Sequence, residues 1–219
     1  MDNHLHTVSI YNGHVKEYVN KFMGLDLYKD TFDSFLEHVP AKGNILELGC
    51  GPGNVVKYLK SKRKDLYILG IDLAPEMIKE AKKQNPDSNF EVMDIRNADQ
   101  IKQKFSAVIA AFCLPYISYN DVAALFRNFY HLTANNGLLY LSCMEGTRER
   151  SGYEKTSFTG DSEIYINYYE RNEIELWLKE HNFDIKAFYT KDYPETDGST
   201  TTDMIYIAKK ISQLGRNLF

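Results

Sequence analysis

Three features are scarce in this sequence, and cysteine is the first. The 219 residues include three cysteines, which are widely spaced and odd in number: Cys50, Cys113 and Cys143. This number and spacing exclude a disulfide framework and give no zinc-ligand pattern. We therefore expect a protein of the reducing cytoplasm that holds no metal.

Long apolar runs are also missing. A membrane helix needs roughly 18 or more consecutive apolar residues, and no stretch of the chain comes near this length. The first residues, MDNHLHTVSI, contain no apolar segment typical of a signal peptide. Neither a membrane span nor export is expected.

An excess of positive charge is the third missing feature. The formal net charge is -4 and the pI is about 5.9. Such a chain has no overall positive field that would concentrate polyanions at its surface. Nucleic acid is therefore a disfavoured partner.

The composition that remains is that of an ordinary globular protein. Hydrophobic residues make up 43% and charged residues 26% of the chain, and its length favours a single domain spanning 1–219. Short apolar runs alternate with amphipathic stretches, which is the pattern of βαβ units. The predicted parallel strands are Ile45–Leu48, Tyr67–Asp72, Phe90–Met93, Ala107–Phe112 and Leu138–Cys143.

Two further strands, Phe183–Tyr189 and Met204–Ala208, are separated by a turn-rich segment, so we expect an antiparallel pair. The predicted fold is α/β: a doubly wound, mostly parallel seven-stranded sheet with an antiparallel C-terminal strand pair and helices on both faces. Residues 1–40 are expected to form an N-terminal helical cover. Residues 145–170, which are polar and contain several glycines, are expected to be an insertion or lid after the fifth strand.

Apolar periodicity predicts the helices between the strands. They are expected over 28–38, from Pro75 onward, over 122–132 and over about 170–181. Ser118 or Asn120 can cap the third of these helices. Asn135-Asn136-Gly137 is expected to form the turn that precedes the fifth strand.

The strongest motif is Glu47-Leu48-Gly49-Cys50-Gly51-Pro52-Gly53-Asn54, between a predicted strand and a predicted helix. Glycine at alternate positions permits positive φ and removes Cβ, so the backbone can approach a ligand at the carboxyl edge of the sheet. A nucleotide-like cofactor is expected there. The dinucleotide fingerprint requires glycine at position 54, where this chain has Asn54, so an NAD site matches less well.

Two aspartates end the next two predicted strands. Asp72 follows the glycine loop by about 20 positions, where a carboxylate can accept hydrogen bonds from the ribose hydroxyls of a ligand held on the loop. Asp94, between Met93 and Ile95, can accept a hydrogen from an adenine amino group while its apolar neighbours hold the ring. Either aspartate alone is as well explained by a helix cap or a turn. Both together, after this loop, favour a nucleoside site.

These features resemble the class I S-adenosylmethionine (SAM)-dependent methyltransferases, from about residue 11 to residue 183. The resemblance implies that the chain binds SAM and transfers its methyl group to a small-molecule acceptor by in-line displacement, leaving S-adenosylhomocysteine (SAH). The residues that it assigns to the cofactor are Glu47, Gly49, Cys50, Gly51, Gly53, Asn54, Asp72, Leu73, Met77, Asp94, Ile95, Phe112 and Leu114.

The chain departs from the family pattern in three places. Ser106 stands where an aspartate commonly follows the first phenylalanine of the fourth-strand motif, and Asn182 replaces the usual glycine before Phe183. Cys113-Leu114-Pro115-Tyr116 lacks the polar first residue of the Asn/Asp-Pro-Pro-Tyr tetrad found in amino-directed methyltransferases. That chemistry is therefore not implied.

Orientation of the reactants can lower a methyl-transfer barrier by roughly 7 to 11 kcal/mol, so the sequence need not contain a catalytic triad. An alcohol, phenol or carbon acid still needs a base. Tyr11, His14 and Tyr18 share one face of the predicted N-terminal helix, which the resemblance places over the SAM pocket. His4 precedes them in a terminus that we expect to be mobile.

Two more tyrosines are candidates for the acceptor site. Tyr116 ends the segment where the resemblance places the methyl group. Tyr169 belongs to an aromatic part of the insertion after the fifth strand. We expect Tyr169→Phe to alter acceptor turnover and to leave SAM affinity unchanged.

Two other functions remain open. A SAM-binding module without catalysis would keep the acids of the cofactor site but would lack an acceptor cavity. An NAD-dependent oxidoreductase would be stabilised by NADH rather than by SAH, because a ligand of the native state stabilises it by mass action. The sequence leaves the acceptor, the methylated atom and the oligomeric state undetermined.

Overall fold

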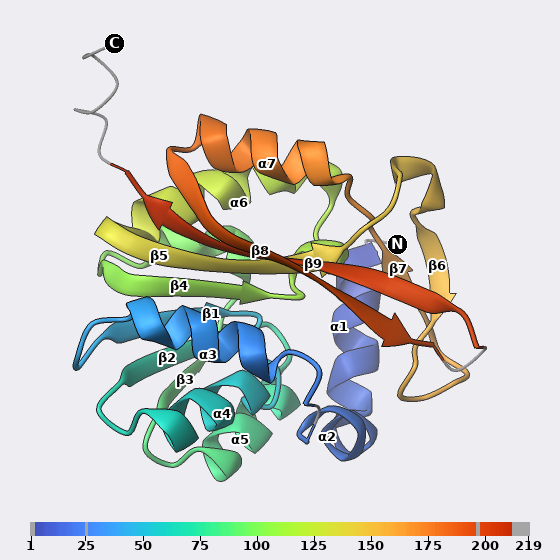
Figure 1. Ribbon diagram of the computed structural model, residues 1–219. Coiled ribbons are helices and arrows are strands. Elements are labelled where there is room, and N and C mark those ends of the chain that lie inside the picture. Colours follow the sequence, from blue (N-terminus) through green and yellow to red (C-terminus); the bar gives the residue numbers. More distant parts are fainter. Residues whose placement is uncertain (1–2, 25, 196–197, 212–219) are drawn as a thin grey trace.

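Seven strands form one central sheet in the order β3-β2-β1-β4-β5-β9-β8 (Figure 1). The computed structural model describes residues 3–24, 26–195 and 198–211. Strands β1 to β5 pair in parallel, whereas β9 is antiparallel to both β5 and β8, which confirms the predicted sheet. The bounds are β1 Asn44–Leu48, β2 Tyr67–Asp72, β3 Asn89–Val92, β4 Phe105–Ala111, β5 Thr133–Met144, β8 Phe183–Pro194 and β9 Thr200–Lys210.

Helices cover both faces of this sheet. Helices α3 (Lys29–His38), α4 (Asn54–Lys62) and α5 (Pro75–Gln84) pack on one face and lie in the lower half of Figure 1. Helices α6 (Tyr119–Leu132) and α7 (Arg171–Glu180) pack on the other face. The strand order reverses between β1 and β4, and open sheets of this kind bind ligands beyond the carboxyl ends of the strands at that point.

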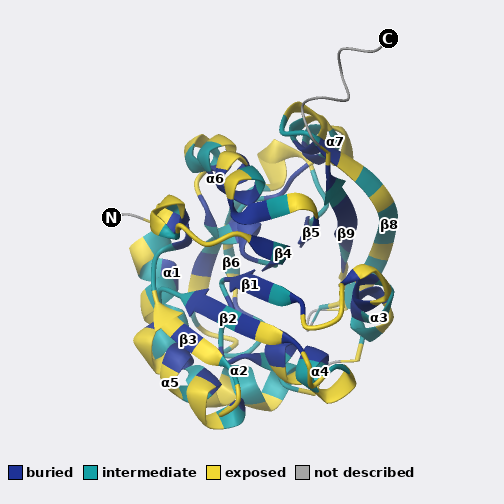
Figure 2. Ribbon diagram, turned by 90° about the vertical axis from the view of Figure 1, so that its left-hand side faces the viewer, coloured by how far each residue is buried: buried dark blue, intermediate teal, exposed yellow. Residues whose placement is uncertain are grey.

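The core divides into two layers because side chains alternate along each strand. In β4, Ala107 and Ile109 face the layer that contains α3, α4 and α5, whereas Val108 and Ala110 face the layer that contains α6 and α7. All four residues are fully buried, as is typical of a parallel strand covered on both sides. Figure 2 shows the same division, with buried strands in the middle and exposed residues on the outer sides of the helices.

A group of smaller elements lies beside the carboxyl ends of the strands. It consists of α1 (Asn3–Gly13), α2 (Val15–Phe22) and a two-stranded hairpin formed by β6 (Gly152–Lys155) and β7 (Glu163–Ile166). Helix α1 contacts both β7 and α5, and in Figure 1 it stands next to the hairpin. The described residues also include three short 3₁₀ helices: η1 Ile95–Gln100, η2 Leu114–Tyr116 and η3 Arg148–Arg150.

Several boundaries differ from the sequence-based expectation. The predicted helix that carries Tyr11, His14 and Tyr18 is interrupted at His14, between α1 and α2. His4 lies inside α1, so the expectation of a mobile segment there was wrong. The insertion after β5 contains the hairpin β6–β7, which periodicity did not predict because each strand has only four residues.

The C-terminal strands are longer than expected. Strand β8 reaches Pro194 and β9 starts at Thr200, so the segment that was expected to be a long turn is largely paired. Strand β5 starts at Thr133, before the expected turn, and the register shift opposite Phe105/Ala107 accommodates Asn136 with a φ of 60°. Ser118 is the N-cap of α6, which decides between the two predicted caps.

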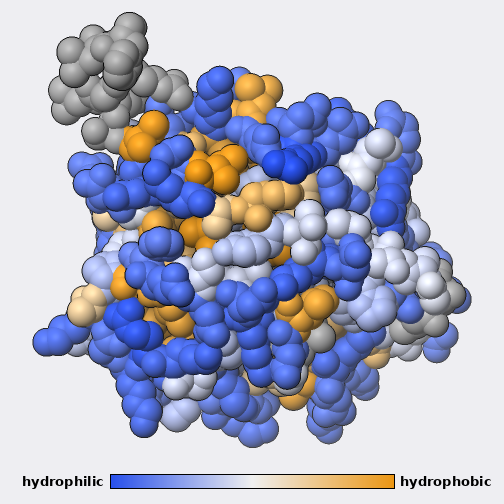
Figure 3. Space-filling model, in the orientation of Figure 1, coloured by the Kyte–Doolittle hydropathy of each residue, from blue (hydrophilic) through white to orange (hydrophobic). Residues whose placement is uncertain are grey.

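The surface is mostly hydrophilic on the face shown in Figure 3, where hydrophobic residues form small areas between charged side chains. The large hydrophobic side chains that are exposed lie on different elements, for example Leu5 on α1, Val92 on β3 and Leu176 on α7. Among the described residues, no helix combines the length and the apolar character needed to cross a membrane.

Candidate functional site

The glycine loop connects the end of β1 to the start of α4. Gly49, Gly51 and Gly53 have φ values of 70°, 50° and 79°, a region that side chains other than glycine rarely adopt. Gly53 is also crowded, since a Cβ added there would lie 2.5 Å from Nδ2 of Asn85. That Nδ2 donates to the carbonyl oxygen of Gly53 at 3.1 Å. The loop is therefore held in one shape, with its backbone open to a ligand at Gly51.

Asp72, at the end of β2, supports this loop. Its Oδ2 accepts a hydrogen bond from the backbone N–H of Gly51 at 2.8 Å, and its Oδ1 accepts from the N–H of Ala74 at 2.9 Å. Burial raises the pKa of Asp72, although these two hydrogen bonds and the charge of His4 lower it in part. A carboxylate has about four acceptor positions, so Asp72 can still accept from the hydroxyls of a ligand.

Glu47, on β1, is the second buried acid of the site. It is 2% exposed, and its Oε2 has no hydrogen-bond partner among the described residues. Burial, and then the neighbouring charge of Asp72, raise the pKa of Glu47 well above its usual range. A buried carboxyl group without a partner is costly, and a cationic ligand group beside it would remove that cost.

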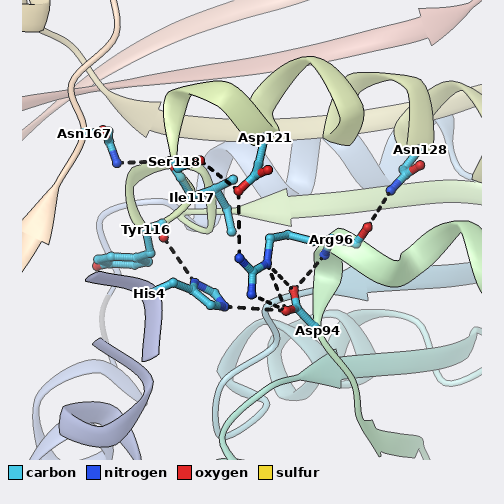
Figure 4. Close-up of polar contacts among 9 residues, drawn as sticks. All are labelled: His4, Asp94, Arg96, Tyr116, Ile117, Ser118, Asp121, Asn128 and Asn167. Carbon is cyan, nitrogen blue, oxygen red and sulfur yellow. Dashed lines mark hydrogen bonds and ion pairs between the residues drawn. The ribbon is translucent and has the colours of Figure 1, made fainter. Parts of the chain in front are cut away.

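Asp94 follows β3 and is held by Arg96, as Figure 4 shows. Its two oxygens accept from Nε of Arg96 at 3.1 and 2.9 Å, and Oδ2 also accepts from Nη2 at 2.7 Å. Nε2 of His4 lies 3.9 Å from the same Oδ2. Burial alone raises the pKa of Asp94, but the hydrogen bonds and charge of Arg96 outweigh it and lower the pKa. The carboxylate is therefore ionised and already partly engaged.

A small cavity lies above the glycine loop; we call it the glycine-loop cavity. Its volume is about 120 Å³. Strand ends and the loop form its floor, and α1 forms its roof through His4, Thr7 and Val8. The other lining residues are Tyr11, Tyr18, Gly49, Gly51, Asp72, Leu73, Ala74, Met77, Ile95, Ala111, Phe112, Cys113, Tyr116 and Ile117.

A larger cavity of about 390 Å³ lies next to it; we call it the aromatic cavity. This volume is within the range of small-molecule sites, about 300 to 1,000 Å³. Most of the ring-bearing side chains around it come from α1, α2, the start of α3, β8 and the hairpin loop. They include Tyr11, Tyr18, Phe22, Tyr28, Phe32, Tyr58, Phe112, Tyr116, Phe158, Tyr168 and Tyr193.

The two cavities share a wall. Tyr11, Tyr18, Phe112 and Tyr116 line both of them, together with backbone at Gly49. The hydroxyl of Tyr11 donates to the hydroxyl of Tyr116 at 2.6 Å, and the Tyr11 and Tyr18 rings meet edge to face at 5.6 Å between centroids. Burial raises the pKa of Tyr116 to about 12, so both hydroxyls are neutral at physiological pH.

Phe112 is held in this wall by strained backbone. Its φ is 54°, and its N–H donates to the carbonyl oxygen of Ser142 at 3.2 Å and to the Ser142 hydroxyl at 3.1 Å. A left-handed conformation costs a residue other than glycine of order 1 kcal/mol or more, and such residues cluster at functional sites. The tip of β4 is thus fixed where the two cavities meet.

Asp203, on β9, contributes a third buried acid, and it lines the aromatic cavity. It is 2% exposed, its Oδ2 accepts from the hydroxyl of Tyr28 at 2.6 Å, and its Oδ1 has no partner among the residues described. Burial raises the pKa of Asp203 to about 7; the Tyr28 hydrogen bond lowers it, and the charges of Glu195 and Asp192 raise it. This carboxyl group can gain or lose a proton near neutral pH.

The structure brings most of the predicted site residues together. Gly49, Gly51, Asp72, Leu73, Met77, Ile95 and Phe112 line the glycine-loop cavity, while Glu47 and Asn54 line the aromatic cavity. Cys50, Gly53, Asp94 and Leu114 lie behind these surfaces and line neither cavity.

The five candidate catalytic residues separate into two groups. Tyr11, Tyr18 and Tyr116 form the shared wall, whereas His14 lies at the break between α1 and α2, with its Nδ1 against the carbonyl oxygen of Ile10 at 2.9 Å. Tyr169 is fully buried in the core, where its hydroxyl donates to the carbonyl oxygen of Leu114 at 3.1 Å. Neither His14 nor Tyr169 lines the glycine-loop cavity or the aromatic cavity.

Sequence reasoning missed Tyr28, Phe158, Tyr193 and Asp203. Phe158 and Tyr193 lie in segments without clear periodicity, so nothing in the pattern placed them at the site. Asp203 gave one signal: it is an acid at the very start of an apolar run, Met204–Ala208. An acid at the start of a buried antiparallel strand can belong to the same site as an acid at the end of a parallel strand, because the antiparallel strand starts at the edge of the sheet where the parallel strands end.

In the described part of the chain, no group of three or more histidine, cysteine, aspartate or glutamate side chains is arranged to hold a metal ion. The three cysteines are free and buried.

Known proteins match both the sequence and the fold. Residues 45–137 match a family model described as a methyltransferase domain. In sequence over these residues, and in fold along most of its length, the chain resembles the SAM-dependent methyltransferases. Trans-aconitate 2-methyltransferase of Escherichia fergusonii is 37% identical over 95 residues, which cover 43% of this chain and 36% of that enzyme.

Longer matches are more distant. Demethylmenaquinone methyltransferase of Thermotoga maritima is 27% identical over 178 residues, covering 72% of this chain and 76% of that enzyme. The crystal structure of a SAM-dependent methyltransferase from Methanosarcina mazei aligns with a TM-score of 0.71 at 19% identity, covering 86% and 100% of the two chains. The chain matches only 40% and 36% of the length of two of its curated relatives, a viral methyltransferase homologue and the Escherichia fergusonii enzyme.

Proposed function

We propose that this chain transfers the methyl group of SAM to a small-molecule acceptor. One observation carries the proposal: a cavity over a glycine loop and a ring-lined cavity of ligand size meet at the tip of β4, where the same few residues line both. One cavity suits a nucleoside cofactor and the other suits an apolar acceptor. The cytoplasmic location expected from the sequence belongs to the same proposal.

The residues present fit SAM. Its positively charged α-amino group would satisfy the unpartnered Oε2 of Glu47, while the open backbone at Gly51 leaves room for the amino-acid tail. Asp72 has acceptor positions left for the ribose hydroxyls. Ile95 and Met77 supply apolar surface for the adenine ring, beside Asp94. When bound, SAM supplies a methyl group activated by a sulfonium.

The chain's own residues then have mainly to position the reactants. The Tyr11–Tyr116 hydrogen bond and the fixed backbone of Phe112 hold the shared wall in place, and the surrounding rings exclude water. Holding two reactants in line supplies roughly 7 to 11 kcal/mol of barrier lowering without an acid or base. Tyr11 and Tyr116 are neutral hydroxyls, so they can donate to or accept from the acceptor.

We further propose that residues 145–170 act as a lid over the acceptor. The hairpin places Ile164 and Ile166 on the aromatic cavity, and Phe158, between its strands, closes one side against Tyr11 with 5.2 Å between ring centroids. The glycine-loop cavity, at about 120 Å³, is smaller than typical ligand sites of about 300 Å³ or more. Cofactor entry therefore requires α1 to move outward.

A cavity of this size and lining favours catalysis over a SAM-binding module that does no chemistry. Such a module needs only the glycine-loop cavity and the acids around it. The aromatic cavity, with a buried titratable acid on its surface, would serve no purpose in it.

Calorimetry with SAH tests the cofactor part of the proposal. We expect wild-type protein to bind SAH and not NADH, and Glu47→Gln to bind SAH at least about tenfold more weakly because the ion pair with the amino group is lost. Glu91→Gln, an exposed change on β3, two strands from β1, is the matched control and should bind like the wild type. Absence of heat with both SAM and SAH would overturn the proposal.

A further inference from the structure

We infer that Asp203 is the residue that receives the acceptor's proton, and that the acceptor is an uncharged, ring-sized molecule carrying a hydroxyl or amine. This inference rests on the proposed function, because it assigns the aromatic cavity to the methyl acceptor. Its starting point is a buried carboxyl group on the surface of an otherwise ring-lined cavity.

One carboxylate oxygen of Asp203 accepts a hydrogen bond, and the other has no partner among the described residues. Tyr28 donates to Oδ2, and the Tyr28 ring lies 4.9 Å from the ring of Phe112, centroid to centroid. Strand pairing places the backbone of Asp203 opposite Met144, at the carboxyl end of β5, and β5 is the strand next to β4. Asp203 is thus connected through a single side chain, Tyr28, to the wall that the two cavities share.

The groups around Asp203 set its protonation. Asp192 on β8 and Glu195 just beyond it repel a negative charge there, and Tyr28, before α3, donates to it. Cys143 on β5, Tyr140 on the same strand and Tyr116 on η2 are neutral neighbours whose own ionisation Asp203 opposes.

Positive groups at the cavity do not neutralise it. No lysine, arginine or histidine in the described ranges forms an ion pair with Asp203. Lys29 is paired with Asp26, and Lys57 donates to the side-chain oxygen of Gln84. Lys155 is exposed on the hairpin. Oδ1 of Asp203 is therefore left as an unused acceptor for a ligand that donates a hydrogen bond.

The charges around the aromatic cavity also disfavour one class of acceptor, the carboxylates. Glu47, Glu154, Glu195 and Asp203 all line it, two of them buried, so a carboxylate-bearing acceptor would place like charges close together in a region of low polarity. The Escherichia fergusonii relative is named for a polycarboxylate acceptor. The acceptor of this chain has the opposite character, with N–H or O–H groups in place of carboxylates.

In the proposed methyl transfer, the Asp203 carboxylate is the base. The lone pair of the acceptor's oxygen or nitrogen forms a bond to the methyl carbon, and the carbon–sulfur bond breaks with its electron pair moving to sulfur. The proton leaves the nucleophile for the Asp203 carboxylate. One positive and one negative charge disappear together, and the products are the methylated acceptor, SAH and a neutral carboxyl group.

Three probes with one ring each, phenol, aniline and benzoate, test the inference on protein saturated with SAH. At about pH 8, where Asp203 is ionised, ligand-observed NMR should detect binding of phenol and aniline and none of benzoate. In Asp203→Asn, Tyr28 keeps the amide oxygen and leaves the NH₂ group for the ligand. Phenol and aniline should then bind at least about tenfold more weakly, and benzoate should bind. Asp184→Asn, an exposed change at the far end of β8, should bind all three probes like the wild type.

Turnover with isotopically labelled SAM and hydroxyl- or amine-bearing ring compounds gives a second measurement. General bases contribute about 100-fold or more, so Asp203→Asn should lose at least that factor in kcat. Tyr28→Phe should shift the acid limb of the pH profile to higher pH, because the hydrogen bond that lowers the pKa of Asp203 is gone. Probe binding that does not depend on Asp203, or a preference for benzoate in the wild type, overturns the inference. The proposed function is judged separately, because SAH affinity should be unchanged in Asp203→Asn.

Discussion

The hydroxyl of Tyr28 donates a hydrogen bond of 2.6 Å to Oδ2 of Asp203. It joins the residue that precedes α3 to the antiparallel strand β9. Without this bond the buried carboxyl group would hold its proton even more tightly, because burial raises its pKa and Tyr28 is the group that lowers it. The Tyr28–Asp203 pair therefore gives the aromatic cavity a carboxyl group whose pKa is about 7.

Asp203→Asn should stabilise the fold at alkaline pH. The pKa of Asp203 is about 7 in the folded state against 3.8 ordinarily, so the folded state binds the extra proton between these values and the free energy of unfolding falls as pH rises through this window. At about pH 8 the variant should be more stable than the wild type, by on the order of 2 to 4 kcal/mol. The difference should shrink toward about pH 4.

Urea unfolding at a series of pH values measures this difference. Asp184→Asn serves as the control, since Asp184 is exposed and pairs with Lys186. Equal pH dependence in Asp203→Asn and the wild type would contradict the assigned pKa.

Gly53→Ala should destabilise the chain more than Gly160→Ala. Both glycines have positive φ, 79° and 76°, so the backbone strain is the same. A Cβ at Gly53 would lie 2.5 Å from Asn85, whereas nothing lies within 4 Å of one at Gly160. We expect losses of roughly 2 to 4 kcal/mol at Gly53 and about 1 kcal/mol at Gly160. Thermal unfolding checks the order, and equal losses would show that crowding by Asn85 is unimportant.

Asp72→Asn should weaken SAH binding by about 10- to 100-fold. The amide has one acceptor oxygen for the N–H groups of Gly51 and Ala74, which now bond two carboxylate oxygens, and its NH₂ opposes one of these donors. Calorimetric titration with SAH measures the change. Asp99→Asn is the control, because Asp99 is exposed on η1 and outside the glycine-loop cavity. Unchanged affinity in Asp72→Asn would remove Asp72 from the cofactor site.

Tyr169→Phe should lower stability and leave turnover unchanged, whereas Tyr116→Phe should lower turnover and leave stability nearly unchanged. The buried Tyr169 hydroxyl bonds the carbonyl oxygen of Leu114, so its loss should cost about 1 kcal/mol of stability with turnover unchanged. This replaces the expectation from sequence that Tyr169 acts on the acceptor. Tyr116→Phe breaks the hydrogen bond to Tyr11 at the shared wall and should lower kcat at nearly constant stability. A fall in kcat in Tyr169→Phe alone would reverse this assignment.

The part of the fold with regular periodicity could be predicted from sequence. Parallel strands buried on both faces appear as short apolar runs, and each helix between them has an apolar face, so β1 to β5 and α3 to α7 were visible. The loop from Glu47 to Gly53 and Asp72 were visible for the same reason. They lie at strand ends, where the chain itself marks the carboxyl edge of the sheet.

The acceptor side could not be predicted, because it is assembled by contacts between distant segments. Phe158 lies in a hairpin of two four-residue strands, too short to show a period. Asp203 faces Tyr28 only because β9 lies between β5 and β8, and local sequence patterns do not predict the order of strands in a sheet. His14 was placed on the same face as Tyr11 by assuming an unbroken helix, which the break before α2 removes.

Helix α1 contacts α5 on one side and β7 on the other, and its Tyr11 belongs to both cavities. A movement that admits a nucleoside beneath α1 must therefore also loosen the hairpin. Binding of the cofactor and binding of the acceptor should therefore be coupled, because each ligand restricts the movement that opens the other cavity. We expect SAH to dissociate most slowly while the methylated product still occupies the aromatic cavity.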